Sequence, residues 1–218
     1  MLDLQAELKK FSIDDFVRIS WPEYIETITA LGDKLEKYIK KNNLKIDVVV
    51  PIMRGAMVAG QYLAYRFGVL KIAPIQYKYF FEATEITMRE ILPFNPTGIP
   101  KDATILVVEQ DHCFGNIGSQ AVLDIKKALL DARVLYAADY MDYSNQKNEG
   151  TDKIFFGKLD NNTKTLSVEE CKKLGIFEKT YMFPWERVDE ESDVISAKQF
   201  KYNDLDEIIK NSEKKRIF

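Results

Sequence analysis

The feature that most constrains the fold of this chain is a short β-branched run that leads through glycines into a helical pattern. Residues 104–108 (TILVV) predict a buried strand. Gly115 and Gly118 follow, and apolar residues at helical spacing over 119–130 predict a helix. The polar residues between them are therefore expected at the carboxyl end of a strand, next to a helix N-terminus.

The same order of strand, turn and helix occurs upstream. Residues 46–52 predict a strand, Arg54 and Gly55 a turn, and residues 56–67 a helix. A further strand-like pattern covers 69–80. Alternation of strand and helix predicts an α/β fold with a parallel sheet. In such sheets ligands bind at the carboxyl ends of the strands.

Composition narrows the class of protein. The chain has 218 residues, 46% of them hydrophobic, which favours a single domain with a full core. Its 31 basic and 34 acidic side chains give a formal charge of −3, which argues against nucleic acid or an anionic membrane as a partner. Two cysteines and one histidine do not make a disulfide framework or a zinc site. No run approaches the ~20 apolar residues of a spanning helix, and we expect a cytoplasmic protein.

Residues that carry chemistry gather at the ends of these strands. The N–H groups of a first helical turn near Gly118 and Ser119 favour an anion such as phosphate, and Arg54 adds a fixed positive charge. Glu109 ends a buried strand, where an unpaired carboxylate is costly. We therefore expect ribose hydroxyls, directly or through Mg²⁺, to satisfy Glu109.

Together the two loops resemble those of the type I phosphoribosyltransferase family, in its 6-oxopurine branch. In that family the first loop binds the pyrophosphate of phosphoribosyl pyrophosphate (PRPP), and the second, after two acidic residues, binds the ribose 5-phosphate. The resemblance covers residues 20–186. Its last part, 181–186 (YMFPWE), is similar to the hood of microbial xanthine-guanine enzymes, which carries purine-binding residues.

The resemblance implies a magnesium-dependent enzyme that joins a 6-oxopurine to PRPP, releasing pyrophosphate and a nucleoside monophosphate. It implies a Rossmann-like parallel-sheet fold and a homodimer or higher homo-oligomer. We expect one domain over 1–218, with a small hood built from parts of 1–20 and 160–218. Residues 81–102 read as a loop that is mobile and closes over the substrate.

The resemblance also assigns binding residues. Those for PRPP or a nucleotide are Arg54, Gly55, Lys78, Glu109, Gln110, Phe114, Gly115, Asn116, Ile117, Gly118 and Ser119. Those for the nucleobase are Tyr181, Met182, Phe183 and Trp185. Either Trp185 or Tyr181 would stack on the base, and Tyr181 is the better stacker if Trp185 belongs to the core.

The second loop departs from the family pattern, which has two acids, two variable residues, then Asp, Thr, Gly, one residue and Thr. On that pattern Gln110 replaces the second acid, and Cys113 replaces the Asp that serves as acid or base near purine N7. Phe114 and Ile117 replace the two phosphate-binding hydroxyls. Backbone N–H groups of this segment could still bind phosphate.

Catalysis is assigned by the resemblance to Glu109, Asp111 and Cys113, and magnesium ligation to Glu109 and Asp111. Asp111 would replace the missing acid after a local shift of register, or is simply a turn residue. A thiol of pKa near ~8.5 exchanges protons poorly with a purine, so Cys113 could instead shape the pocket. His112 is either a proton-transfer group or a structural residue.

Two other functions stay open at this point. One is a protein of the same fold that binds a nucleotide or PRPP without turnover, which the residues at Gln110, Cys113 and Phe114 favour. The other is a different α/β enzyme acting on phosphorylated sugars or nucleotides, with the anion loops but no purine hood.

Overall fold

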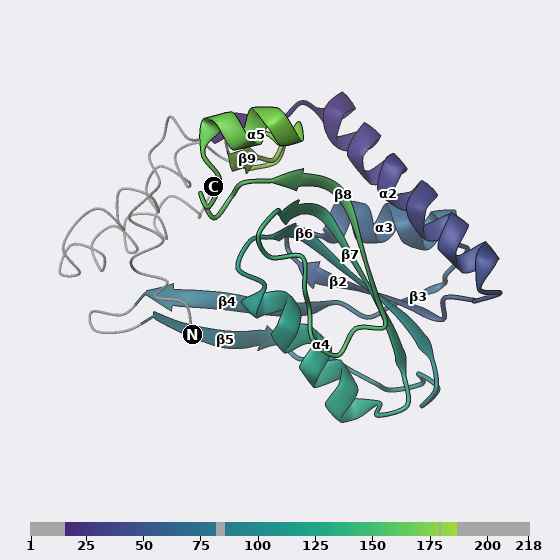
Figure 1. The fold of residues 1–218 in the computed structure, drawn as a ribbon. Coiled ribbons are helices and arrows are strands. Elements are labelled where there is room, and N and C mark those ends of the chain that lie inside the picture. Colours follow the sequence, from purple (N-terminus) through teal and green to yellow (C-terminus); the bar gives the residue numbers. More distant parts are fainter. Residues whose placement is uncertain (1–15, 82–85, 179, 187–218) are drawn as a thin grey trace.

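A mostly parallel sheet forms the centre of the protein (Figure 1). The computed structural model describes residues 16–81, 86–178 and 180–186. The main sheet has seven strands in the order β5, β4, β2, β6, β7, β8, with β3 paired to β2. These strands are β2 (Val48–Met53), β3 (Lys71–Ile72), β4 (Ile75–Phe81), β5 (Ile86–Leu92), β6 (Thr104–His112), β7 (Arg133–Asp142) and β8 (Lys153–Asp160). All pairs are parallel except β4 with β5, so the predicted α/β fold is confirmed.

Helices cover both faces of this sheet (Figure 1). Helices α2 (Trp21–Lys41) and α3 (Met57–Arg66) lie on one face, and α4 (Asn116–Ala128) lies on the other. Alternate residues of β6 point to the two sides: Leu106 and Val108 pack with α2 and α3, and Ile105 and Val107 with α4. Strands that are buried on both faces read as continuous apolar runs, which is why the sequence revealed them.

The chain changes direction between β2 and β6. From β2 it passes through α3 to β4 on one side, whereas β6 pairs with the other side of β2 and continues through α4 to β7. The turns that follow β2 and β6 therefore lead away from each other, on opposite faces of the sheet. In open α/β sheets this switch point leaves a crevice outside the carboxyl ends of the strands.

A second, smaller sheet joins the two ends of the described chain. Strand β1 (Phe16–Arg18) pairs in parallel with β9 (Thr180–Met182), and the short helix α5 (Val168–Leu174) lies beside them near β8 (Figure 1). This sheet is built from the regions predicted to make the hood, although residues 1–15 and 187–218 lie outside the described residues. We refer to β1, β9 and the following residues up to Glu186 as the hood.

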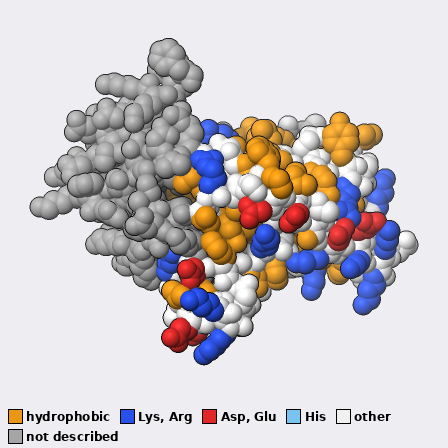
Figure 2. All heavy atoms as spheres, turned by 90° about the horizontal axis from the view of Figure 1, so that it is seen from above, with side chains coloured by type: hydrophobic (Ala, Val, Ile, Leu, Met, Phe, Trp, Pro, Cys, Tyr) orange, Lys and Arg blue, Asp and Glu red, His pale blue; other side chains and the backbone are white. Residues whose placement is uncertain are grey.

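The ring of Tyr24 on α2 packs against the hood. It contacts the rings of Phe183 and Trp185, at centroid distances of 6.0 and 4.9 Å. Nearby, Trp21 and Ile25 are about half exposed. Apolar side chains also gather on the face seen from above in Figure 2.

The prediction of a loop over 81–102 is wrong for Ile86–Leu92, which form β5. Residues 82–85 lie outside the described part, and 93–102 contain no helix or strand. The prolines that excluded regular structure all follow Leu92. The earlier residues pair with β4 and form the edge strand of the sheet, and Met88 among them packs against the core. Closure of this segment over a substrate stays a prediction.

We predict that the buried carboxyl of Asp139 makes stability depend on pH. Its Oδ2 accepts a hydrogen bond of 2.7 Å from the Tyr24 hydroxyl, and burial raises the pKa of Asp139 to about 8. Because this pKa lies above that of the unfolded chain, stability falls as pH rises from about 4 to about 8, by up to about 1.4 kcal/mol per pH unit. Urea unfolding of Asp139→Asn across this range should show a shallower decline than wild type. The exposed-site control Asp131→Asn should keep the wild-type slope, and equal slopes for Asp139→Asn and wild type would contradict the prediction.

Candidate functional site

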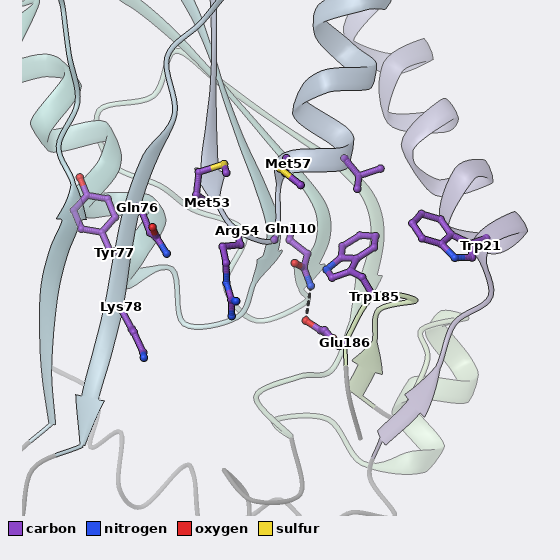
Figure 3. Close-up of a pocket in the computed structure, with 12 residues that line it drawn as sticks. Trp21, Met53, Arg54, Met57, Gln76, Tyr77, Lys78, Gln110, Trp185 and Glu186 are labelled. Carbon is purple, nitrogen blue, oxygen red and sulfur yellow. Dashed lines mark hydrogen bonds between the residues drawn. The ribbon is translucent and has the colours of Figure 1, made fainter. Parts of the chain in front are cut away.

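A pocket of about 640 Å³ lies at the switch point, at the carboxyl-end side of β2, β4 and β6 and beside the hood (Figure 3). This volume is typical of small-molecule sites. The lining residues are Trp21, Met53, Arg54, Gly55, Met57, Val58, Gln76, Tyr77, Lys78, Gln110, Trp185 and Glu186. The pocket thus brings together Arg54, Gly55, Lys78, Gln110 and Trp185 of the predicted site.

The pocket is cationic at one end and apolar at the other. Arg54 comes from the turn after β2 and Lys78 from β4, and both side chains point toward the same open side in Figure 3. The peptide bond before Arg54 is cis. Across from them, Trp185 lies 5.6 Å from the ring of Trp21 and next to Met57. An anionic group and a flat apolar group could therefore bind side by side.

Gln110, near the end of β6, contacts both the turn that follows β2 and the hood. Its side chain lies where a β-carbon at position 55 would be, so Gly55 is required by close approach and not by a left-handed backbone. Its Nε2 donates a hydrogen bond of 2.9 Å to Oε1 of Glu186, drawn in Figure 3. The other oxygen of Glu186 accepts a bond of 2.7 Å from the Phe183 amide.

Glu109 is buried and has partners within the protein. The Tyr136 hydroxyl donates to its Oε2, and Nδ1 of His112 lies 3.0 Å from the same oxygen. Nδ1 also lies 2.9 Å from the Tyr136 oxygen. Residues of β7 and the end of β6 thus supply partners for Oε2 of Glu109, and the predicted binding of ribose hydroxyls or Mg²⁺ by this residue stays a prediction.

Asp111 is not brought to the pocket. Its Oδ2 accepts a hydrogen bond from Asn162, and its Oδ1 is buried with no hydrogen-bond partner among the described residues. Burial, and then the charge of Asp160, raise the pKa of Asp111 well above its usual value. The position of Asp111 gives no support to its predicted catalytic and metal-binding roles.

The predicted phosphate loop is shorter than expected, because β6 continues to His112 and α4 begins at Asn116. Gly115 precedes the helix with φ of 75°, and no side chain caps it. Ile117 packs against the core on the α4 side. Cys113, Phe114 and the residues up to Ser119 do not line the pocket. Their phosphate-binding and catalytic roles stay predictions.

Of the four predicted nucleobase residues, Trp185 alone lines the pocket. The ring of Tyr181 stacks on Phe177 at 5.0 Å. Phe183 and Met182 are buried, with 2% and 4% of their surfaces exposed. Trp185 also stacks on the ring of Phe183 at 5.5 Å, and its predicted role in stacking on a base stays a prediction.

Several lining residues were missed by the sequence analysis: Trp21, Met53, Met57, Val58, Gln76, Tyr77 and Glu186. Glu186 is the last residue of the quoted hood motif, which is a signal that could have identified it. Trp21 opens a helix far from the loops in sequence, so only the packing of α2 under the hood places it here.

A protein-built magnesium site does not fit these residues. Within the described ranges, no group of three or more His, Cys, Asp or Glu residues is arranged to hold a metal ion. Glu186 is the carboxylate of the pocket, and both its oxygens accept hydrogen bonds.

None of the described helices has the length and apolar character needed to cross a membrane.

The sheet order, the two turns at the switch point and the hood define the type I phosphoribosyltransferase fold. Solved structures with this fold include a purine phosphoribosyltransferase from Pyrococcus horikoshii, 21% identical, with a TM-score of 0.55 over 79% of this chain and 95% of that one. A hypothetical protein from Neisseria gonorrhoeae with bound ppGpp is 16% identical, with a TM-score of 0.57 over 84% and 96%. The Helicobacter pylori xanthine-guanine-hypoxanthine phosphoribosyltransferase is 14% identical, with a TM-score of 0.54 over 81% and 97%. No protein-family model and no curated protein matches the sequence.

We predict that Gly118→Ala destabilises the protein through the Glu109 cluster. A β-carbon at position 118 would overlap the Tyr136 hydroxyl and lie 2.9 Å from Oε2 of Glu109. Overpacking of this kind costs about 1 to 3 kcal/mol of unfolding free energy. Urea unfolding should show this loss, whereas the neighbouring control Ser119→Ala should remain within about 0.5 kcal/mol of wild type. Wild-type stability of Gly118→Ala would mean that the cluster is not packed as described.

Proposed function

We propose that this protein transfers a phosphoribosyl group from PRPP to a 6-oxopurine base, giving a nucleoside monophosphate and pyrophosphate. The observation that carries the proposal is the pocket at the switch point, with Arg54 and Lys78 at one end and Trp185 at the other. The fold shared with purine phosphoribosyltransferases supports it.

The reaction needs positioning and charge stabilisation more than a protein nucleophile. A purine nitrogen forms a bond to the anomeric carbon of ribose, the bond from that carbon to the pyrophosphate oxygen breaks, and the purine loses a proton. Negative charge grows on the departing pyrophosphate. Arg54 and Lys78 would bind that group and stabilise the charge. Trp185 would hold the flat base against the apolar end of the pocket.

Magnesium and self-association are also part of the proposal. Mg²⁺ often binds through substrate phosphates and water with few protein ligands, so it would enter with PRPP and not at a preformed protein site. A homo-oligomer is favoured by the exposed apolar side chains of Trp21, Ile25 and Met57, each about half exposed.

A second candidate function is a nucleotide-binding regulator without turnover. It is favoured by the bond between Gln110 and Glu186 and by the internal partners of Glu109. Together these leave the pocket without the two acidic side chains of the family pattern. The solved N. gonorrhoeae protein of this fold, which holds ppGpp, supports this alternative.

The proposal is tested by incubating the purified protein with PRPP, Mg²⁺ and each of guanine, xanthine, hypoxanthine, adenine, uracil and orotate, with chromatographic detection of product. We expect a monophosphate from one or more of the three 6-oxopurines. Product from adenine or a pyrimidine alone would overturn the 6-oxopurine assignment. Failure to form product, together with calorimetric binding of a nucleotide such as ppGpp, would favour the regulator.

We predict that Arg54→Ala lowers kcat/KM for PRPP by about 100-fold or more, because removing one donor to the developing charge typically has this effect. Lys45→Ala is the matched control: it removes an exposed cation near the opposite end of β2 and should leave kcat/KM unchanged. Steady-state kinetics of pyrophosphate release would measure both. Unchanged turnover in Arg54→Ala would exclude this residue from binding the leaving group.

A further inference from the structure

We infer that Gln110 is a positioning residue that holds Glu186, and through it the hood, on the carboxyl end of β6. It follows that the pocket requires an uncharged hydrogen-bond donor at position 110. The inference concerns how the pocket is assembled. Only its effect on ligand affinity rests on the function proposed above.

The Gln110 side chain packs against the turn that follows β2, at Gly55. A β-carbon at position 55 would overlap the Gln110 side-chain amide, so this side chain fills the space that the glycine leaves. Packed against the loop, the amide points its Nε2 at Glu186, 2.9 Å away (Figure 3). The donor is therefore held in place before it meets the hood.

Hydrogen bonds to residues at the ends of both hood strands, β9 and β1, hold Glu186 in place. Its Oε2 accepts from the amide of Phe183, just after β9. Its backbone carbonyl accepts a bond of 2.6 Å from Nη2 of Arg18, at the end of β1. Arg18 also donates to the carbonyl of Pro184, at 3.1 Å. The bond between Gln110 and Glu186 consequently connects the main sheet to the whole hood.

A carboxylate at position 110 could not make this connection at neutral pH. Two ionised carboxylates at hydrogen-bond distance repel each other, and the pKa of one rises until they share a proton. Among the described residues, the charged or titratable groups that face this point include Arg54, Tyr77 and Lys78 across the pocket, Arg18 on the hood side and the buried Asp111. The guanidinium of Arg18 is directed at backbone carbonyls of the hood, so it does not replace the missing donor.

The test uses Gln110→Glu in a Trp21→Phe background. The chain has two tryptophans, so Trp185 in the hood becomes the only one and its emission reports the hood directly. At about pH 8 the variant should show red-shifted emission of Trp185, because repulsion opens the hood. As pH falls toward about 4.5 the two carboxyls can share a proton, and the shift should reverse.

Two further variants make this test specific. Gln110→Glu combined with Glu186→Gln exchanges donor and acceptor, and should restore wild-type emission at all pH values. Gln76→Glu adds the same charge on β4, on the far side of Arg54 in Figure 3, and should produce no such pH-dependent shift. Circular dichroism verifies that each variant is folded. Unchanged emission of Gln110→Glu at about pH 8, or failure of the exchanged pair to restore it, would overturn the inference.

A second measurement follows the ligand. With Trp21 present, PRPP should bind Gln110→Glu about tenfold or more weakly than wild type at about pH 8, and the exchanged pair should recover the affinity. Full PRPP affinity of Gln110→Glu in a folded protein would overturn the inference. If wild type itself does not bind PRPP, the proposed function fails, whereas the emission measurement still decides the role of Gln110.

Discussion

The parallel pairing of β2 with β6 is the constraint on which the rest of the structure depends. The register runs from Val48 beside Ile105 to Pro51 beside Val108, so the two strands end side by side. Because α3 and α4 lie on opposite faces, the turns after these strands separate and leave the pocket between them. Arg54 and Gln110 meet in that pocket although 55 intervening residues separate them in the sequence.

The strands and the two turns were predictable because their signals are local. A strand buried on both faces must be apolar throughout, and a turn that ends it needs glycine or a polar residue. The pocket contains Arg54, Gly55, Lys78 and Gln110, which the resemblance assigned to it. Arg54 and Gly55 follow the end of β2 as predicted, whereas Lys78 and Gln110 lie within β4 and β6. The strand β5 was missed because nearby prolines dominate the composition of its segment, although they lie just beyond it.

The partners of the polar residues were not predictable, since they come from distant elements. A buried carboxylate such as Glu109 can be satisfied by a ligand or by the protein, and the sequence does not show that Tyr136 on the adjacent strand reaches it. Burial also determines which of the aromatic residues predicted to bind a nucleobase reach the pocket. Of the aromatic residues near the end of the described chain, Phe183 is enclosed by Tyr24 and Tyr140, whereas Trp185 borders the pocket.

Two neighbouring polar residues near the end of β6 have specific partners, and one of them, Gln110, departs from the family pattern. Gln110 donates to Glu186, and Glu109 accepts from Tyr136 next to His112. A buried polar group left unpaired costs about 1 to 3 kcal/mol, and among the described residues of this segment such atoms remain on Asp111 and His112, which do not line the pocket. In the pocket, Arg54 and Lys78 lie at one end, and Gln110 makes a hydrogen bond to Glu186 where the family pattern has a second acid. If the protein binds PRPP as proposed, a pocket assembled before the ligand arrives would lower the ordering cost of binding, whether or not turnover follows.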